Sequence, residues 1–265
     1  MYLDYYGLTD FPFTITANPQ FFYASASHEE ALAALQYGIA ERKGIILLTG
    51  EVGTGKTTLC RSLLDRLEHE IRSSLILNPY FNSTQLLEAI IQDFGMVPEN
   101  KNKLSLLNQL NRFLIESAGN KTTAVVIIDE AQNLSSAQLE QIRLLSNLET
   151  SQAKLLQIIL CGQPELEKKL QAFKLRQLKQ RISVRYSLSA LTEKDIKNYI
   201  LCRLSKAGNT QVVIRDDSFD IINEFSQGIP RLINVLCDRA LLCGYARDVK
   251  ELGPDIFQAC VKELS

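Results

Sequence analysis

Two groups of residues in this sequence are suited to phosphate chemistry, and the first is a glycine-rich loop. Its pattern, G-x-x-x-x-G-K-T, is that of a phosphate-binding loop, in which glycines let the backbone wrap closely around an anion. The loop amides and the start of the following helix would direct positive charge at the phosphates. Lys56 can reach the β- and γ-phosphates, and the Thr57 hydroxyl can ligate Mg²⁺. The predicted nucleotide-binding residues are Gly50, Glu51, Val52, Gly53, Thr54, Gly55, Lys56, Thr57 and Thr58.

The second group is a pair of adjacent carboxylates, Asp129 and Glu130, which end the apolar stretch 125–128. In a phosphate-loop protein this is the Walker B arrangement, where Asp129 would hold Mg²⁺ directly or through water. Glu130 would polarise the attacking water as a general base. The pair favours hydrolysis over phosphoryl transfer to an alcohol. Two solvated acids at a strand end are the alternative.

Two amide side chains follow other apolar stretches. Gln163 comes after the stretch 155–161 and could touch the γ-phosphate or the attacking water. Asn78 lies near the end of the second predicted strand, 75–80, and could hydrogen-bond Glu130 and gate it. Polar residues after strands are common, so the evidence from position alone is weak.

A basic segment, residues 168–185, holds seven basic residues and no acid. It allows three interpretations: a solvated helix face, contacts with DNA phosphates, or an arginine that enters the nucleotide site of a neighbouring subunit. Arg181 is the first candidate for such an arginine finger and Arg185 the second.

Arg231 is a further candidate for binding phosphate. Pro230 suits the first turn of a helix, which puts Arg231 at a helix N-terminus, where a cation opposes the helix dipole. A triphosphate bound nearby would offset that local conflict.

The elements that must position these residues alternate along the chain. Apolar strands are predicted at 44–50, 75–80, 124–129, 155–161 and 182–188, with helices at 57–70, 84–95, 104–118 and 136–149. Continuous apolar strands separated by helices indicate an α/β fold with a parallel sheet covered on both faces. Helices alone are predicted near 192–207, 216–227, 230–246 and 254–264.

Three regions follow from this pattern. Residues 44–191 form the predicted α/β core and 192–265 a helical domain. Residues 1–43 form an aromatic-rich strap and a helix that we assign to the core. The strap aromatics could pack against the next domain or sandwich an adenine base, and the sequence does not favour either role.

Bulk properties exclude several classes. The 265 residues carry 29 basic and 30 acidic side chains, so no net charge attracts nucleic acid or an anionic membrane. No transmembrane span or secretory signal is present. Six cysteines without a C-x-x-C pair, and two histidines, make a zinc site unlikely and fit a reducing cytosol. We therefore expect a soluble cytoplasmic protein.

Several longer stretches carry a family resemblance. They are Met1-Tyr2-Leu3-Asp4-Tyr5-Tyr6-Gly7-Leu8, Pro12-Phe13, Leu47 to Thr58, Leu77-Asn78-Pro79, Ile128 to Leu134, Leu144 to Thr150 and Gly162 to Leu166. Together they resemble the ATPase domain of the ExeA/GspA-type general secretion proteins, whose relatives serve MSHA-type pilus biogenesis. The order of phosphate loop, Asp129-Glu130, Gln163, Arg181 and Arg231 is similar to Walker A, Walker B, sensor 1, arginine finger and sensor 2 of an AAA+ ATPase.

The resemblance implies a three-layer αβα core of the ASCE type with a five-stranded parallel sheet. The sensor strand would lie between the two Walker strands, and an all-helical lid would follow. It also implies ATP, Mg²⁺ and nucleotide-dependent homo-oligomers, as rings or dimers, with a secretion or pilus assembly protein as partner. Full ExeA-like proteins continue into a membrane span and a peptidoglycan-binding part. This sequence lacks both, so we expect either a short, pilus-type member or a truncated cytoplasmic fragment. A partner or a missing segment would bring it to the cytoplasmic face of the inner membrane.

Four functions compete. The leading one is Mg²⁺-dependent ATP hydrolysis that assists assembly of a bacterial secretion or pilus apparatus. The alternative is a DNA-associated ATPase similar to the TniB/TnsC transposition regulators, which the basic segment supports and the net charge opposes. A small-molecule kinase is opposed by Glu130. A nucleotide-dependent scaffold with negligible turnover is the fourth.

Overall fold

The computed structural model describes residues 2–67, 71–150, 153–208 and 211–264. These residues form two compact units. The helical unit comprises Met1–Ala26, Val52–Thr58 and Ser189–Ser265, and the α/β unit comprises Ser27–Glu51 and Leu59–Leu188. The phosphate loop therefore groups with the helical unit, although both of its ends continue into the α/β unit.

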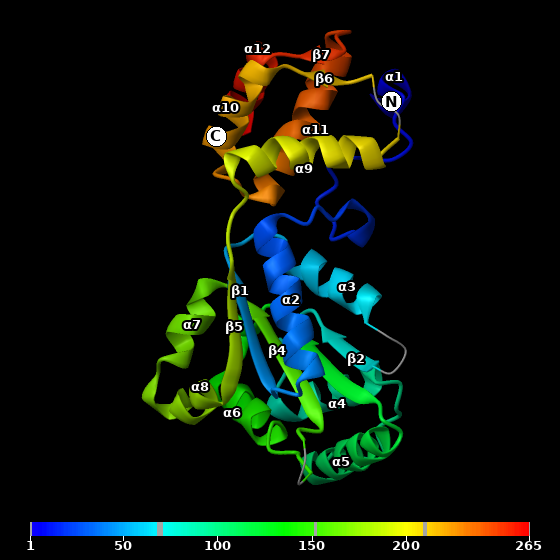
Figure 1. Ribbon diagram of the computed structural model, residues 1–265, viewed down its shortest axis with the longest axis vertical. Coiled ribbons are helices and arrows are strands. Elements are labelled where there is room, and N and C mark those ends of the chain that lie inside the picture. Colours follow the sequence, from blue (N-terminus) through cyan, green and yellow to red (C-terminus); the bar gives the residue numbers. More distant parts are fainter. Residues whose placement is uncertain (1, 68–70, 151–152, 209–210, 265) are drawn as a thin grey trace. The chain divides into compact units, whose positions relative to one another are not determined.

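A five-stranded parallel sheet forms the centre of the α/β unit (Figure 1). Its strands lie in the order β2-β3-β4-β1-β5, which confirms the predicted sheet and puts β4 between β3 and β1. The carboxyl ends of all five strands meet at one edge, the usual place for a ligand in such sheets. The strands are β1 (Ile45–Gly50), β2 (Ile71–Ile76), β3 (Thr123–Ile128), β4 (Leu156–Gly162) and β5 (Ile182–Leu188).

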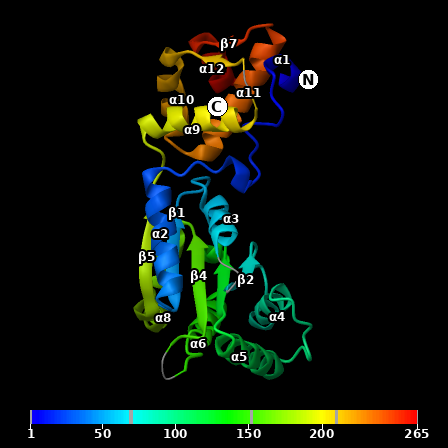
Figure 2. The same ribbon diagram turned by 45° about the vertical axis from the view of Figure 1, so that its right-hand side comes forward.

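Helices cover both faces of this sheet, which gives the predicted three layers (Figure 2). Ile46 points to the face of α2, where a Cβ on Gly38 would lie 2.5 Å from Ile46 Cδ1. Ile45 and Leu47 point to the opposite face and join the main apolar core. One layer holds α2 (Ala26–Ala40) and α3 (Lys56–Arg66). The other holds α4 (Ser83–Asp93), α5 (Lys103–Gly119), α6 (Ser136–Leu145), α7 (Pro164–Leu170) and α8 (Arg176–Arg181).

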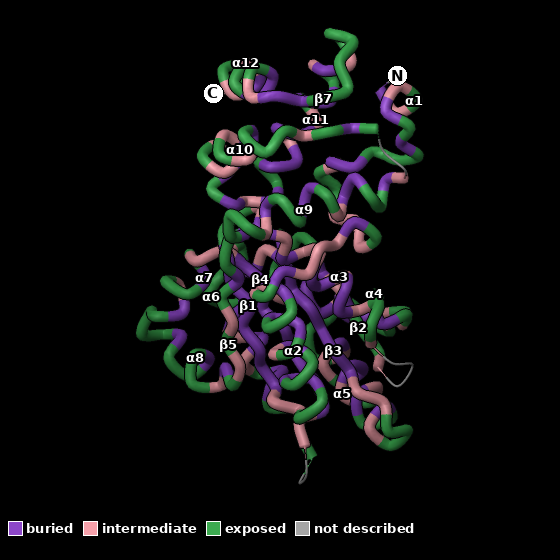
Figure 3. Tube along the Cα trace, turned by 45° about the horizontal axis from the view of Figure 1, so that its top comes forward, coloured by how far each residue is buried: buried purple, intermediate pink, exposed green. Residues whose placement is uncertain are grey.

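The second strand lies four residues earlier than the sequence predicts. It covers Ile71–Ile76 instead of 75–80, because β2 is an edge strand paired with β3 alone. Arg72 and Ser73 are exposed, so an apolar-run criterion misses the strand's first half. Figure 3 shows the contrast with the continuously buried central strands. The predicted helix 57–70 ends at Arg66, and residues 68–70 lie outside the described part of the chain.

The helical unit contains the four helices predicted for the C-terminal region and a short extra ladder. Its larger elements are α1 (Tyr2–Tyr6), α9 (Glu193–Lys206), α10 (Phe219–Ser226), α11 (Pro230–Ala246) and α12 (Pro254–Leu264). The expectation of an all-helical domain needs one correction, since β6 (Val213–Ile214) pairs in parallel with β7 (Glu251–Leu252). Two residues per strand are too few to produce a recognisable strand pattern. The described residues also form the 3₁₀ turns η1 (Pro19–Phe21), η2 (Ala131–Asn133), η3 (Phe173–Leu175) and η4 (Asp216–Ser218).

The N-terminal strap forms part of the helical unit's core. Its aromatic side chains Tyr2, Tyr6, Phe13 and Phe21 are buried together with apolar residues of α9, α11 and α12. Packing is therefore the role that the structure gives these four rings. Residues 1–26 group with residues 189–265, whereas only 27–43 of the segment that we assigned to the core group with the sheet.

A buried arginine fastens the strap. Arg203 of α9 is 7% exposed and donates from Nε to Pro12 O at 2.5 Å and from Nη2 to Thr14 O at 3.1 Å. Its Nη1 donates to the Tyr199 hydroxyl at 2.9 Å. Such charge-assisted bonds are roughly twice as strong as neutral ones, so the strap is held by polar contacts as well as by packing.

Two further findings concern the chain as a whole. All six cysteines are free thiols. Within the described ranges, no helix is both long and apolar enough to cross a bilayer.

Candidate nucleotide site

The phosphate loop connects the end of β1 to the start of α3. Gly53 and Gly55 have φ of +82° and +99°, a backbone region open mainly to glycine. Helix α3 begins at Lys56, whose side chain is 6% exposed. The loop thus presents successive amides and a helix N-terminus, the arrangement that binds phosphate.

The first turn of α11 contacts this loop inside the helical unit. The Arg231 amide donates to Gly53 O at 3.2 Å. A Cβ on Gly53 would lie 2.7 Å from Arg231 Cβ and 3.0 Å from Ile229 Cγ2. Pro230 occupies the first turn of α11, as the sequence predicts. The structure therefore brings Arg231 next to the loop, through a main-chain hydrogen bond and the Cβ of its side chain.

The two carboxylates follow β3 at the carboxyl edge of the sheet. Asp129 is 2% exposed, and its amide donates to Ile76 O at 2.8 Å, which extends the ladder with β2 by one residue. Asp129 Oδ1 accepts from the Glu130 amide at 2.9 Å. Glu130 has a φ of +50°, in the left-handed region that few residues other than glycine adopt. The chain therefore turns sharply at Glu130 and enters η2.

Two side-chain amides hold the Glu130 carboxylate. Gln132 Nε2 donates to Glu130 Oε2 at 2.5 Å, and Gln163 Nε2 donates to the same oxygen at 3.2 Å. Gln132 Oε1 accepts from the Gln163 amide at 3.1 Å. The structure thus places Gln163 beside Glu130, while its predicted contact with the γ-phosphate or the attacking water stays a prediction. Sequence reasoning missed Gln132, although an amide two residues after the glutamate was the available signal.

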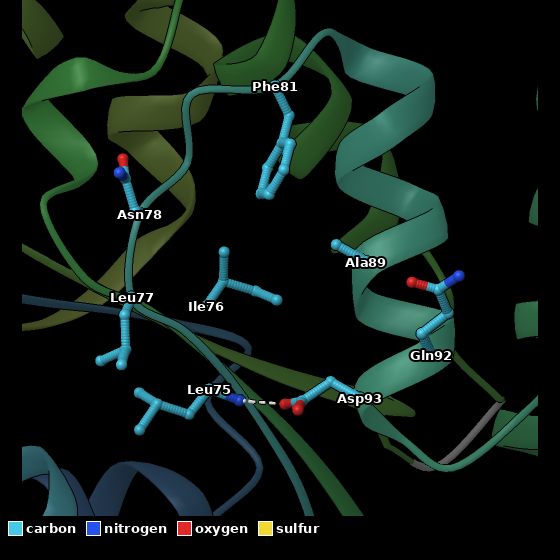
Figure 4. Close-up of a pocket in the computed structure, with 8 residues that line it drawn as sticks. All are labelled: Leu75, Ile76, Leu77, Asn78, Phe81, Ala89, Gln92 and Asp93. Atoms are coloured by element: carbon cyan, nitrogen blue, oxygen red, sulfur yellow. Dashed lines mark hydrogen bonds between the residues drawn. The ribbon is translucent and has the colours of Figure 1, made fainter.

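Asn78, the other candidate partner of Glu130, makes no hydrogen bond to its carboxylate. Among the described residues, the side chains that bond to the Glu130 carboxylate are Gln132 and Gln163. Asn78 is exposed and lines an open pocket of about 480 Å³ beside β2 and α4. In Figure 4 its side chain points away from Phe81 and Ala89, which lie on the helix side of that pocket. The proposed gating of Glu130 by Asn78 therefore has no hydrogen bond to support it.

Arg181 lies at the amino end of β5, on the side of the sheet away from the carboxyl end of β1. It ends α8 immediately before β5, which pairs in parallel with β1. A seven-residue strand spans about 23 Å at about 3.3 Å per residue, so Arg181 is far from the end of β1. Arg181 interacts with Glu149, whose carboxyl pKa is lowered mainly by a hydrogen bond from Lys154 and in part by the charge of Arg181. Arg181 could therefore contact the phosphates of a bound nucleotide only in the site of a second subunit.

Other members of the basic segment have partners within the chain. Lys169 Nζ donates to Gln132 O at 2.8 Å and to Leu134 O at 2.6 Å. Arg185 Nη2 donates to Lys179 O at 2.8 Å. Arg176 lies over the Phe173 ring, 4.4 Å from its centroid. Part of the segment's positive charge is thus engaged in holding its own fold.

Comparisons with known proteins agree with this geometry. A family model described as an AAA domain matches residues 39–170. General secretion pathway protein A of Aeromonas hydrophila is 46% identical over 248 residues, which are 93% of this chain and 45% of that protein. The chain therefore spans less than half the length of this relative.

Two solved structures share the fold. Cdc6p from Pyrobaculum aerophilum superimposes with a TM-score of 0.70 at 18% identity, over 92% of this chain and 70% of that one. The ORC2 protein of Aeropyrum pernix, solved as ADPNP and ADP complexes, gives a TM-score of 0.69 at 17% identity, over 88% and 66%. At such identities the likeness concerns the fold alone.

The sheet order, the phosphate loop and these matches define the chain as a member of the AAA+ class, with a P-loop αβα core and a helical C-terminal part. An AAA+ fold implies nucleotide binding. Within the class, the chain is a relative of General secretion pathway protein A and resembles the ATPase domain of the ExeA/GspA type.

Proposed function

We propose that the chain hydrolyses ATP in an Mg²⁺-dependent reaction. The observation that carries this proposal is the Glu130 carboxylate, which follows β3 and is held by two amides through one of its oxygens. A carboxylate restrained in this way can orient a water molecule and take its proton. The loop after β1 and the carboxylates after β3 belong to strands whose carboxyl ends share one edge of the sheet.

The roles of the individual residues follow from their chemistry. Lys56 and the amides of residues 50–58 would bind the β- and γ-phosphates. The Thr57 hydroxyl and the Asp129 carboxylate are the hard oxygen donors that Mg²⁺ prefers, so the residues present fit this metal. When bound, Mg²⁺ would neutralise charge that develops on the phosphate oxygens. Gln163 would contact the water or the γ-phosphate, and Arg231 the phosphates.

Turnover is expected to need a second subunit. Arg181 lies at the amino end of β5, away from the carboxyl end of β1, so it cannot complete the site of its own chain. In a nucleotide-dependent dimer or ring it could stabilise the transition state of a neighbour's reaction, as an arginine finger does. Arg185 is the weaker candidate, because Lys179 O already accepts a hydrogen bond from its guanidinium.

The biological role that we propose is to assist assembly of a secretion or pilus apparatus from the cytoplasmic side of the inner membrane. The support is the relationship to General secretion pathway protein A. Because the chain spans 45% of that protein, its partners and membrane attachment are part of the proposal.

Binding to DNA is the less favoured function. The basic segment 168–185 is the observation for it, but Lys169, Arg176 and Arg185 have partners within the chain. The formal net charge of −1 provides no general attraction for DNA. Filter binding of duplex DNA with ATP at two salt concentrations tests it, since contacts with phosphates must weaken as salt rises.

The test of hydrolysis compares phosphate release by the wild type and two variants, without any acceptor alcohol. We expect Lys56→Ala to lose nucleotide affinity, and Glu130→Gln to keep affinity while turnover falls to background. Normal hydrolysis by Glu130→Gln would refute the assignment of the base. Absence of turnover in the wild type at every protein concentration would favour a nucleotide-dependent scaffold.

The test of a shared site mixes two inactive variants. Arg181→Ala keeps its own phosphate loop, and Lys56→Ala keeps its arginine, so mixed assemblies contain some complete sites. We expect turnover to reappear on mixing. Failure at every mixing ratio, with both variants folded and assembled, would argue against a contribution from a neighbouring subunit.

A further inference from the structure

Gln132 occupies the centre of a hydrogen-bond network that the proposed roles leave unexplained. Its amide group uses both ends: Nε2 donates to Glu130 Oε2, and Oε1 accepts from the main-chain amide of Gln163. Gln132 therefore connects the turn after β3 with the turn after β4. Gln163 itself bonds to the same Glu130 oxygen, which closes a ring of three residues.

The surrounding structure is shaped to keep Gln132 in this position. Gly162 ends β4, and a Cβ there would lie 2.8 Å from Gln132 Oε1, so any larger residue would displace the amide. Lys169 of α7 donates to the carbonyls of Gln132 and Leu134, which fixes the backbone of η2. Neither contact involves Glu130. Both therefore indicate, independently of the hydrogen bond to Glu130, that the position of Gln132 is fixed.

The need for such a support comes from the backbone of Glu130. With φ of +50°, this residue is in a conformation that costs about 1–3 kcal/mol for a side chain other than glycine. Such a conformation persists only where surrounding contacts hold it, and the two amide donors to the Glu130 carboxylate are contacts of this kind. Both amides donate to Oε2, which directs the other oxygen, Oε1, towards the role of proton acceptor.

We infer that Gln132 is a positioning residue, which orients the Glu130 carboxylate to activate the attacking water. Gly162 and Lys169 hold Gln132 in place. The inference rests on the proposed ATPase function. Gln132 does not itself touch the reacting atoms. It fixes Oε2, so that the water-activating oxygen of Glu130 keeps its place in every catalytic cycle.

The test measures kcat, KM and nucleotide affinity for Gln132→Ala, Gln132→Asn and the control Asn133→Ala. Asn133 is the exposed neighbour in the same turn, and its truncation leaves the network intact. We expect Gln132→Ala to lower kcat about 10- to 100-fold, which corresponds to about 1.4–2.7 kcal/mol. KM and nucleotide affinity should stay within about twofold, because the phosphate loop is untouched. Gln132→Asn keeps the amide on a shorter stem, so it should recover part of the lost kcat.

A second variant tests whether the position of the Gln132 amide matters, and not only its presence. Gly162→Ala keeps the side-chain amides of Gln132 and Gln163 but displaces Gln132 Oε1. It should therefore also lower kcat at unchanged KM. The double variant Gly162→Ala with Gln132→Ala should lose less kcat than the product of the two single fold-losses. The reason is that Gln132 Oε1, the atom that Gly162→Ala displaces, is already absent.

The outcomes distinguish this inference from the function it rests on. If the wild type shows no turnover, the proposed ATPase function fails. If the wild type is active and Gln132→Ala has the same kcat, the positioning role fails alone. A rise in kcat would also overturn it, since Gln132 would then restrain Glu130 in an inactive orientation.

Discussion

Replacing Gly53 by alanine tests whether the first turn of α11 contacts the phosphate loop as the structure shows. Gly53 has a φ of +82°, and its added Cβ would meet Arg231 Cβ at 2.7 Å. The matched control is Gly95→Ala, at φ of +83°, where no atom of the described residues lies within 4 Å of the new Cβ. Both variants introduce the same backbone strain, and only one introduces a clash.

The magnitudes follow from these contacts. A left-handed alanine costs about 1–2 kcal/mol at either position. At Gly53, forcing α11 away adds about 1–3 kcal/mol for overpacking. Loss of the hydrogen bond from the Arg231 amide to Gly53 O adds about 1 kcal/mol. The excess over the control is therefore about 2–4 kcal/mol, or at least about 4 °C in the thermal midpoint for a chain of this size.

Two measurements check this prediction. Thermal unfolding compares the two variants with the wild type, and amide hydrogen exchange followed by mass spectrometry reads the first turn of α11. We expect Gly53→Ala to be the less stable variant and to exchange faster at Arg231. Equal midpoints and unchanged exchange at Arg231 would refute the contact.

Three further predictions concern the helical unit. Arg203→Leu should destabilise it by about 2–3 kcal/mol, because the buried Pro12 carbonyl loses its donor and the part-buried Thr14 carbonyl keeps only the one from Asn234. Arg239→Leu, at an exposed ion pair, should cost under about 1 kcal/mol, and urea unfolding compares the two variants. Burial raises the pKa of Tyr6 from 10.0 to about 12, so its contribution to stability is complete below pH 10 and is lost as pH rises towards 12. Tyr6→Phe should lack this alkaline loss in unfolding experiments. Burial also raises the pKa of the Cys237 thiol, and that of Cys260 to about 11, so both should resist alkylation by iodoacetamide at pH 8 until the chain unfolds.

The sequence predicted the central elements well, for a physical reason. Strands β1, β3 and β4 are buried along nearly their whole length, so each appears as an uninterrupted apolar run. Helices α11 and α12 begin with prolines that suit a first turn, and both predicted ranges agree with the structure. The predicted range of the edge strand β2 was wrong because the first half of this strand is exposed to solvent. Polar residues are tolerated at exposed strand positions, so this half lacks an apolar run.

Features that depend on distant contacts could not be predicted in the same way. The role of Gln132 depends on three hydrogen bonds and on the missing side chain of Gly162, which is 30 positions later. The strap's place in the helical unit depends on partners about 190 residues away, such as Arg203 and Pro12. Local periodicity carries no information about either. The phosphate loop was the opposite case, because its chemistry lies within nine consecutive residues.

The position of the strap also has a consequence for synthesis. Pro12 is separated by 191 residues from the guanidinium that binds it, and Tyr2 by 236 residues from Asp238, which accepts a hydrogen bond from its hydroxyl. At about 5–20 residues per second, the ribosome delivers Arg203 about 10–40 s after Pro12. During that interval the α/β unit can already form, while a stretch rich in tyrosine and phenylalanine has no core to enter. The strap is made before the elements that bind it, so it is among the last of these segments to fold. Its aromatic side chains stay open to a chaperone until α9 and α11 have formed.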